Sequence, residues 1–534
     1  MINFGKHKKF LLGLGFGALI AVSVGVRLPH FKTMHPYFYY YDEWRQANQS
    51  LKLIRNKTLN PDWFLYPHFS LYPTALAYAA YFFATNFREI IAQKSLAPAF
   101  EAAQKMDELS WQALLIERIC FFCFSMLSVI GFFFLARSLL GDGFGLAASF
   151  IYSLFPLAVT FSHIAKVDTF VVCFGILALL FEVRLLRQGR ARDYVLSAFF
   201  AALTFDSKVN YDAVLSFFVA MFLRAANENA RPLKAMLDRR VIYAVSALAA
   251  TMILANPFYF AHLNRAFQDA SWLIYSVSWI PYYHFYPQHW WLDKYYYALT
   301  VIIPAMAGVP VWVLALAGIA YKIVKIDFKE WFLMLFNFFS FGYTFTNFMH
   351  FPYLTFYFLP LIALFCGLTI QLIYRHRGRA GKIAGLAVLA LILLISFHRR
   401  DFYQLTNFQA FDTAGKWMAK ELKPGSKLIS FSVHPPGPGL NRLEAKQVWP
   451  QDLSRKMIVR ENPEYILVSA WDFAGFNKYY RNKIPIAKYY HELLDGQWGY
   501  KVIHHFPVSY PGDWWYQLLD SEFIVDLILL EKVH

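Results

Sequence analysis

Five polar residues that lie far apart in the chain could act together in one chemical step. Each stands at or near the end of an apolar run, and they are Asp42, Glu43, Asp168, Lys208 and His350. A charged side chain near the hydrocarbon of a bilayer is costly in free energy, so it usually has a task. A carboxylate can take a proton from a hydroxyl group, and a lysine can hold a phosphate at headgroup depth. The set predicts an active site at the outer surface of a membrane.

Each carboxylate also has a structural interpretation. Asp42 and Glu43 follow the aromatic run 37–41, a setting in which a carboxylate can serve as a general base. Alternatively, Asp42 is the N-cap of a helix that starts at residue 44. Asp168 opens an apolar run just after Lys166, and an ion pair between these two would be purely structural.

The lysine and the histidine also each have a structural and a functional interpretation. Lys208 lies in a polar break at 205–211, where it could simply extend its ammonium group to the membrane surface or be neutralised by Asp206. A fixed cation at that depth is also what a lipid-linked phosphate requires. His350, in the short turn 347–352, is either structural or a donor to a phosphate oxygen or a sugar hydroxyl.

Together these groups match the needs of an inverting glycosyl transfer. A carboxylate takes the proton of an acceptor hydroxyl as its oxygen attacks the anomeric carbon of a sugar. That carbon passes through an oxocarbenium-like state, as in glycoside hydrolysis. The departing lipid phosphate needs a cation or positioned donors. Base and cation belong at the outer surface because a flipped lipid-linked sugar presents its head there.

The apolar runs that must position these residues define the fold class. The chain has 534 residues, of which 58% are hydrophobic, and its mean hydropathy is +0.35, whereas soluble domains are about 45–50% apolar. The sequence predicts a polytopic α-helical membrane protein with about eleven transmembrane helices. The expected spans are 10–26, 112–136, 143–161, 166–183, 193–205, 208–223, 241–256, 297–320, 331–346, 352–373 and 383–397.

The charge pattern predicts the orientation. The formal net charge is +16, but most Lys and Arg residues fall in short loops, so they are topology signals and no nucleic-acid partner is expected. With a cytoplasmic N-terminus, the short outer loops hold only four of them, Lys166, Lys208, Arg265 and Lys294. This asymmetry predicts a multi-pass protein of the cell inner (plasma) membrane whose C-terminal tail is extracytoplasmic.

Two domains are expected. Residues 1–397 form the transmembrane domain, with an outer loop at 27–111 that carries interfacial helices at 44–56 and 71–87. A second outer loop, 257–296, is dense in aromatic residues and is either an interfacial belt or a platform for a sugar or prenyl chain. Residues 398–534 form a small soluble α/β domain, with a helix at 413–422 and strands at 427–432, 464–469 and 523–531.

The sequence indicates no certain cofactor. All four cysteines lie in expected spans, so they are expected to pack in the core, and no disulfide framework is implied. Asp42 and Asp168 could share a divalent cation, although no ligand spacing demands one.

Several motifs, in order along nearly the whole chain, resemble a known family. They are Tyr41–Trp44, Leu59–Tyr72, His163–Asp168, Ser207–Tyr211, Met349–Pro360 and Asp412–Lys427. The chain resembles the GT-C superfamily of polyprenyl-phosphate-sugar-dependent glycosyltransferases, which contains the protein O-mannosyltransferases and the lipid A aminoarabinose transferases. The resemblance implies a GT-C-like transmembrane domain and a mannosyltransferase-like enzyme of the cell envelope.

The resemblance also implies a role for each residue. Asp42 would be the base for the acceptor hydroxyl, with Glu43 supporting it, and Asp168 would position the acceptor or help bind a metal. Lys208 and Tyr211 would hold the donor phosphate. The sequence departs from the family at Phe351-Pro352, where an Arg is common beside the Tyr, and His350 is the substitute there.

The implied partners are a polyprenyl-phosphate-linked sugar donor, membrane lipids, and an extracytoplasmic acceptor that is a lipid, a glycan or a protein. Two other classes of function are also compatible with the sequence. One is a transporter or flippase for lipid-linked sugars, which would carry charges near the membrane midplane on broken helices. The other is a non-catalytic accessory subunit whose tail binds glycans.

Overall fold

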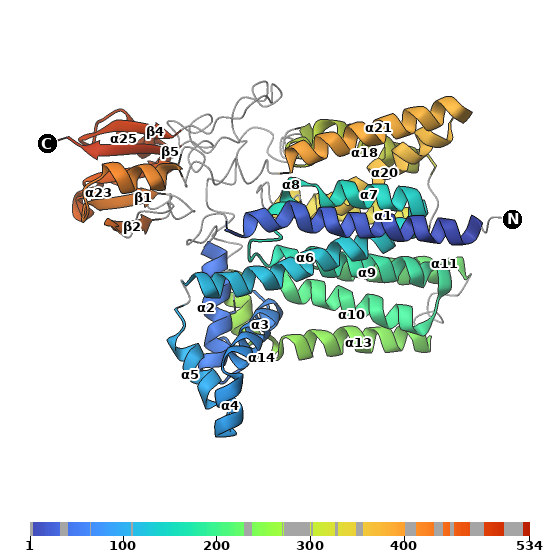
Figure 1. Ribbon diagram of the computed structural model, residues 1–534, viewed down its shortest axis with the longest axis horizontal. Coiled ribbons are helices and arrows are strands. Elements are labelled where there is room, and N and C mark those ends of the chain that lie inside the picture. Colours follow the sequence, from blue (N-terminus) through green and yellow to red (C-terminus); the bar gives the residue numbers. More distant parts are fainter. Residues whose placement is uncertain are drawn as a thin grey trace.

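The computed structural model shows a long helical bundle with a smaller sheet-containing unit at one end (Figure 1). It describes residues 4–32, 41–64, 66–107, 110–228, 238–269, 271, 299–300, 303–325, 329–348, 356–376, 378–400, 413–431, 442–448, 453–469, 485–506 and 527–533. The N-terminal end of α1 (Phe4–Arg27) lies at the opposite end of the bundle from the sheet.

The bundle consists of apolar helices. They are α1 (Phe4–Arg27), α6 (Trp111–Leu140), α7 (Asp142–Ser153), α8 (Pro156–Thr160), α9 (Asp168–Gln188), α10 (Ala191–Lys208), α11 (Asp212–Asn227), α13 (Arg239–Ala255), α17 (Ile303–Ala307), α18 (Val309–Val324), α19 (Glu330–Phe348), α20 (Leu359–Arg375) and α21 (Gly378–Arg399). Within the described ranges, α1, α6, α9 and α21 are long and apolar enough to cross a membrane by themselves. The prediction of a polytopic α-helical membrane protein is confirmed, whereas the number of crossings stays a prediction.

Three expected spans differ from the observed helices. The expected span 297–320 is covered by two helices, α17 and α18, which meet at Gly308. The expected span 143–161 is split into α7 and α8, because Pro156 cannot continue α7 and instead begins α8. The structure also places Lys208 at the C-terminal end of α10, whereas the sequence pattern suggested the start of the following span.

Four helices pack at the end of the bundle where α9 begins. They are α2 (Tyr41–Arg55), α3 (Leu71–Thr85), α4 (Phe87–Gln93) and α5 (Ala97–Lys105), and the short helices η1 (Leu28–Lys32), η2 (His68–Ser70) and α14 (Pro257–Ala261) lie at the same end. The helices expected within 27–111 are therefore present. Their placement on the bilayer surface stays a prediction.

The tail contains a five-stranded sheet that the sequence predicted only in part. Its strands and remaining helices are β1 (Lys427–Phe431), β2 (Glu444–Val448), α23 (Arg455–Glu461), β3 (Tyr465–Ser469), α25 (Pro485–Leu494), β4 (Tyr500–Phe506) and β5 (Leu527–Lys532). The strand order is β2-β1-β3-β5-β4; β1 pairs in parallel with β2 and β3, and β5 pairs antiparallel with β3 and β4. The strands β2 and β4 were not predicted, because their polar and charged residues hide the apolar pattern of a strand.

Alternate residues of this sheet face two different apolar clusters. Ile429 and Ile466 pack with Tyr490 of α25, whereas Leu428 and Leu467 belong to a cluster that includes Met418 of the helical segment 413–421. Because side chains alternate across a strand, the central strands are buried on both faces. The tail is thus a layered α/β unit, while its domain boundary stays a prediction.

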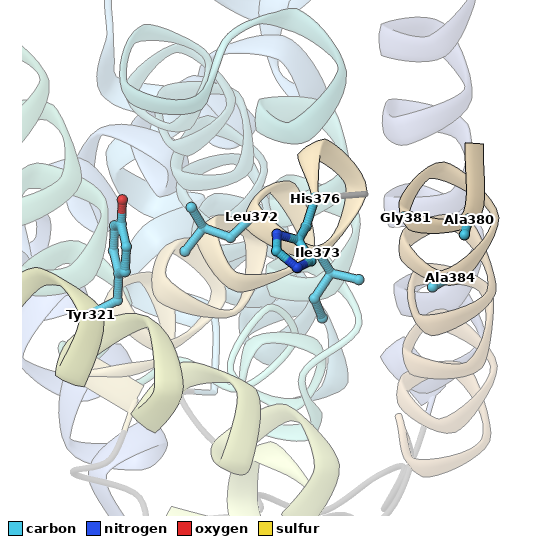
Figure 2. A pocket seen from close by; sticks show the side chains of 7 residues that line it. All are labelled: Tyr321, Leu372, Ile373, His376, Ala380, Gly381 and Ala384. Atoms are coloured by element: carbon cyan, nitrogen blue, oxygen red, sulfur yellow. The ribbon is translucent and has the colours of Figure 1, made fainter. Parts of the chain in front are cut away.

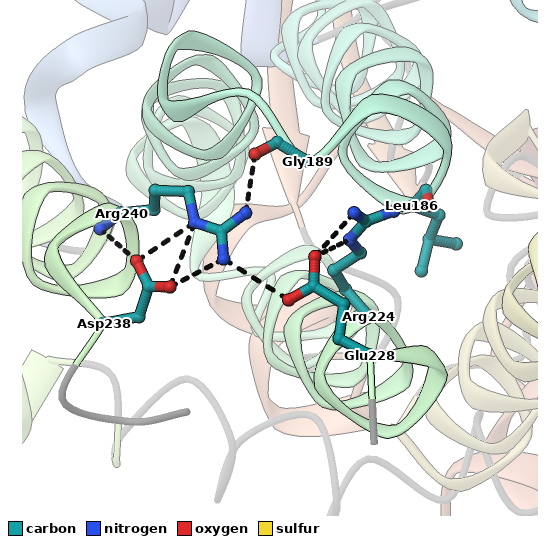
Figure 3. Close-up of polar contacts among 6 residues, drawn as sticks. All are labelled: Leu186, Gly189, Arg224, Glu228, Asp238 and Arg240. Carbon is teal, nitrogen blue, oxygen red and sulfur yellow. Dashed lines mark hydrogen bonds and ion pairs between the residues drawn. The ribbon is translucent and has the colours of Figure 1, made fainter. Parts of the chain in front are cut away.

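A charged network fixes the helix ends that lie opposite the sheet (Figure 3). Arg240 binds Asp238 at 2.6 Å and Glu228 at 3.3 Å, and it donates to the carbonyl of Gly189 at 2.9 Å. Glu228 also accepts from Arg224 at 2.5 Å. Hydrogen bonds from Arg240 lower the pKa of Asp238, so the network stays charged near neutral pH. It ties the ends of α9, α11 and α13 together.

Candidate active site

Asp168 is the centre of a polar cluster where α9 begins and α10 ends. Its side chain is fully buried, and its Oδ1 accepts a hydrogen bond from the Lys208 ammonium group at 2.9 Å. The hydroxyl of Tyr357 donates to the same oxygen. The second oxygen, Oδ2, has no hydrogen-bond partner among the described residues. Because ionic hydrogen bonds are short and strong, the pair fixes the ammonium group of Lys208 at this end of the bundle.

A second lysine stands on the segment that leads into α9. Lys166 is buried, its ammonium group lies 5.6 Å from the centre of the Phe161 ring, and it is close enough to act electrostatically on Asp168. Thr169 donates to the carbonyl of Phe161 at 2.9 Å, which fixes the turn between α8 and α9. The carboxylate of Asp168 therefore has two cations near it.

Glu43 lies in a separate, fully buried ion pair with Arg118 of α6. Arg118 donates to both carboxylate oxygens, through Nε at 3.1 Å and Nη2 at 3.2 Å. The backbone N–H of Ala165 donates to Glu43 Oε1 at 3.2 Å, and Arg118 Nη1 donates to the carbonyl of Phe31 at 3.0 Å. A carboxylate that accepts from three donors is held in place, so Glu43 is suited to supporting the site.

This ion pair links the two acidic motifs. Ala165 precedes Asp168 by three residues, and Glu43 follows Asp42 directly. The bond from Ala165 to Glu43 thus joins the first turn of α2 to the start of α9. Asp42 is the second residue of α2, but its side chain lies outside the described residues.

The segment 61–70 lies over the lysine of the cluster. The ammonium group of Lys208 is 6.0 Å from the centre of the Tyr66 ring. His68, which is fully buried, donates from Nε2 to the carbonyl of Trp63 at 2.7 Å and packs against the rings of Phe64 and Tyr259. These contacts join the segment to the residues that follow α13.

We expect acidification to weaken the contacts that His68 makes with Trp63, Phe64 and Tyr259. Burial lowers the pKa of His68 to about 4; the hydrogen bond to Trp63 opposes this shift, and nearby His262 adds to it. A free histidine has a pKa of about 6.5. Between about pH 4 and about pH 6.5, His68 therefore binds more protons when it is released from its buried site than when it is in place. The contact is therefore fully stable above about pH 6.5 and loses about 3 kcal/mol as the pH falls to about 4.

Melting curves of the wild type and His68→Asn at pH 7 and pH 4.5 would measure this effect. The wild type should lose more stability on acidification than the variant, which has no imidazole to protonate. An equal loss in both proteins would contradict the prediction.

Two predicted site residues are brought together by the structure, and others are not. Asp168 and Lys208 form an ion pair, so Lys208 pairs with Asp168 and not with its neighbour Asp206. Tyr211 lies three residues beyond Lys208, directly before α11, with 40% of its side chain exposed. His350 and the aromatic residues of 272–296 lie outside the described residues. The roles predicted for Tyr211 and His350 stay predictions.

The predicted divalent cation is likewise untested. Within the described part of the chain, no group of three or more His, Cys, Asp and Glu side chains could hold a metal ion. A site shared by Asp42 and Asp168 would depend on a side chain that the structure does not describe.

Comparison with known proteins gives a family match for the segment that carries this cluster. Residues 107–260 match the family model described as dolichyl-phosphate-mannose-protein mannosyltransferase. The matched segment contains Arg118, Asp168 and Lys208. The predicted resemblance to the GT-C superfamily is thereby confirmed over this segment of the chain. No curated protein sequence matches the chain.

Solved structures show a weaker likeness over more of the chain. ArnT from Cupriavidus metallidurans bound to undecaprenyl phosphate is 12% identical, with a TM-score of 0.49, and the match covers 96% of this chain and 97% of ArnT. The apo form of the same ArnT is 11% identical, with a TM-score of 0.46 and coverages of 99% and 98%. An oligosaccharyltransferase from Archaeoglobus fulgidus, tethered to an acceptor peptide, is 11% identical, with a TM-score of 0.49 and coverages of 90% and 72%.

Three residues of the site were not singled out from the sequence. Glu117 and Arg118 are adjacent charges inside the apolar run of α6, and the cost of charge in a span is the signal that could have revealed them. Tyr357 lies in a tyrosine- and phenylalanine-rich stretch in which no local pattern distinguishes it from its neighbours. Only the fold, which places it against Asp168, identifies it.

A cavity lies between α18, α20 and α21 (Figure 2). It is an open, mainly apolar groove of about 570 Å³, lined by side chains of α18, α20 and α21 and by His376. It is close to residues 376–384, at the end of α20 where α21 begins, whereas Tyr357 precedes the other end of α20. This groove therefore has no part in the chemistry of Asp168 and Lys208.

Proposed function

We propose that this protein moves a sugar from a polyprenyl-phosphate carrier to an acceptor hydroxyl, with inversion at the anomeric carbon. The observation that carries the proposal is the ion pair of Asp168 and Lys208, which holds a cation where α9 and α10 meet. A matched family described by its use of dolichyl-phosphate-mannose supports a donor of the same class, a sugar on a lipid phosphate.

In the proposed reaction, Lys208 binds the donor phosphate. The phosphate oxygens would share the ammonium group with Asp168, and Lys166 would add a second positive charge nearby. When the bond between the anomeric carbon and the phosphate oxygen breaks, its electron pair stays on the phosphate. A fixed cation stabilises that developing charge without reorganisation. Tyr211 and His350 are proposed as further donors to the phosphate.

Asp42 is the proposed base. Its carboxylate takes the proton of the acceptor hydroxyl while the hydroxyl oxygen attacks the anomeric carbon. Glu43 supports it, because three hydrogen-bond donors fix the first turn of α2. We place this reaction on the extracytoplasmic side of the cell inner membrane, with the N-terminus in the cytoplasm.

One observation favours a transporter or flippase as a second candidate. Glu182 is a fully buried carboxyl of α9, 14 residues beyond Asp168, and it accepts from Ser216 at 2.5 Å. Asn337 donates to Ser216 at 2.7 Å. Charges within the bundle are typical of transporters, but a buried carboxyl that bridges α9, α11 and α19 also serves packing alone.

Asp42→Asn tests the proposed transfer. We expect turnover to fall about 10²–10⁴-fold, the usual contribution of a general base, while binding of the lipid-linked donor is unchanged. Asp495→Asn, a matched change at an exposed position of the tail, should retain full turnover. Wild-type turnover in Asp42→Asn would show that Asp42 is not the base. Donor movement across the bilayer without transfer would favour the transporter.

A further inference from the structure

Glu117 is a buried carboxyl that the proposed reaction has not used. It lies in the second turn of α6, its side chain is fully buried, and neither of its oxygens has a hydrogen-bond partner among the described residues. Leaving a buried polar group without a partner destabilises a protein, and for a carboxylate the cost is larger still. Such a group calls for an explanation in function or in bound water.

The surroundings of Glu117 form a polar seam between α2, α3 and α6. Its buried polar members are Glu43, Gln46, Ser50, Ser70, Thr74, Tyr78, Glu117 and Cys120. Gln46 donates to the Ser70 carbonyl at 2.7 Å and to Thr74 at 3.3 Å. The seam thus continues from the first turn of α2 to the start of α3.

Glu117 and Glu43 are two carboxyl groups beside the guanidinium group of Arg118. Glu43 and Arg118 are both close enough to act on it electrostatically. The bidentate bonds of Arg118 go to Glu43, and the hydroxyl of Tyr78 donates to the carbonyl of Ala113 at 2.9 Å. Two charged carboxylates beside one guanidinium would leave an uncompensated buried charge, so Glu117 is held with its proton.

We propose that Glu117 is a proton-relay residue, which carries away the proton that the base takes from the acceptor hydroxyl. The inference rests on the proposed transfer. In the proposed step, one oxygen of Glu117 accepts the proton that has left the acceptor hydroxyl, while the other oxygen releases its own proton into the polar seam. Glu117 is neutral before and after the step, so no other reactant is needed. A leucine would fill the same space at lower cost, but it could not exchange a proton.

Glu117→Gln and Glu117→Ala test this role. Glutamine keeps the shape and polarity but cannot relay a proton, so we expect turnover to fall about 10²-fold at unchanged KM for the donor. The melting temperature of Glu117→Gln should equal or exceed that of the wild type, because a poorly solvated acid has been removed. Added formate, a small acid that fits the space left by the side chain, should restore turnover in Glu117→Ala.

Two controls make the outcomes distinct. Glu101→Gln, at an exposed position of α5, should behave as the wild type, and Asp42→Asn should not respond to formate. Wild-type turnover in Glu117→Gln would overturn the relay. The relay would also be overturned if the Glu117 variants lost turnover only to the extent that their melting temperature falls, and if formate did not restore turnover in Glu117→Ala. If the wild type itself transfers no sugar, the proposed function fails, independently of Glu117.

Discussion

Replacing Lys208 by Met is expected to lower turnover about 10²–10³-fold, the effect of removing one group that stabilises a developing negative charge. Methionine keeps the length and the apolar stem of lysine but has no charge. The affinity for free polyprenyl phosphate should fall as well, because the phosphate has lost its fixed cation. Titration of the purified variant with the lipid phosphate and a turnover assay would measure the two effects.

The same substitution should destabilise the protein. Asp168 is fully buried and Lys208 is only 17% exposed, so the change leaves a buried carboxylate without the cation that is hydrogen-bonded to it, which costs about 3–5 kcal/mol. The matched control is Lys488→Met, which removes an exposed ion pair with Glu492 and should cost less than about 1 kcal/mol.

A double variant separates stability from function. Asp168→Asn with Lys208→Met removes both charges, so it should be more stable than Lys208→Met alone, yet it should stay inactive. Turnover that returns together with stability would show that the ion pair is only structural. Unchanged phosphate binding in Lys208→Met would show that the phosphate binds elsewhere.

Breaking the pair of Glu43 and Arg118 is expected to have the second large effect. Arg118→Leu removes both hydrogen bonds of the guanidinium group to the buried carboxylate of Glu43, and it releases the Phe31 carbonyl. We expect a loss of about 3–5 kcal/mol in the free energy of unfolding. Turnover should fall as well, because Glu43, which joins the first turn of α2 to the start of α9, is no longer held in place by Arg118.

A double-mutant cycle measures this coupling. Glu43→Leu and Arg118→Leu are compared singly and together by chemical unfolding and by turnover. The double variant should recover much of the stability, since apolar residues can replace a buried ion pair, but it should not recover turnover. Additive losses of stability in the two single variants would contradict a direct interaction between them.

The apolar helices and the polar ends of α9 and α10 could be predicted from the sequence because the cost of burying charge leaves a clear pattern. Asp168 and Lys208 stand out against apolar neighbours, and the sequence placed both at the same membrane surface. The ion pair between them agrees with that placement. Their pairing itself was not predicted, since Lys166 and Asp206 are nearer in the chain. Distance along the chain favoured those neighbours, whereas helix packing decided the actual partner.

Other parts of the site depend on tertiary structure alone. Arg118 comes 75 residues after Glu43, and Tyr357 comes 189 residues after Asp168, so no local pattern could have paired them. In the tail, β2 and β4 are edge strands of the sheet. An edge strand needs no continuous apolar run, which is why the sequence predicted the central strands and not these two.

The most direct measurement is release of free polyprenyl phosphate by the purified protein in nanodiscs. A panel of radiolabelled polyprenyl-phosphate sugars would be supplied with an extract of envelope acceptors, with and without EDTA. We expect release from at least one donor, with the sugar recovered on an acceptor, and loss of both in Lys208→Met. The EDTA arm shows whether a divalent cation takes part. Binding of a lipid-linked sugar without release from any donor would contradict the proposed transfer.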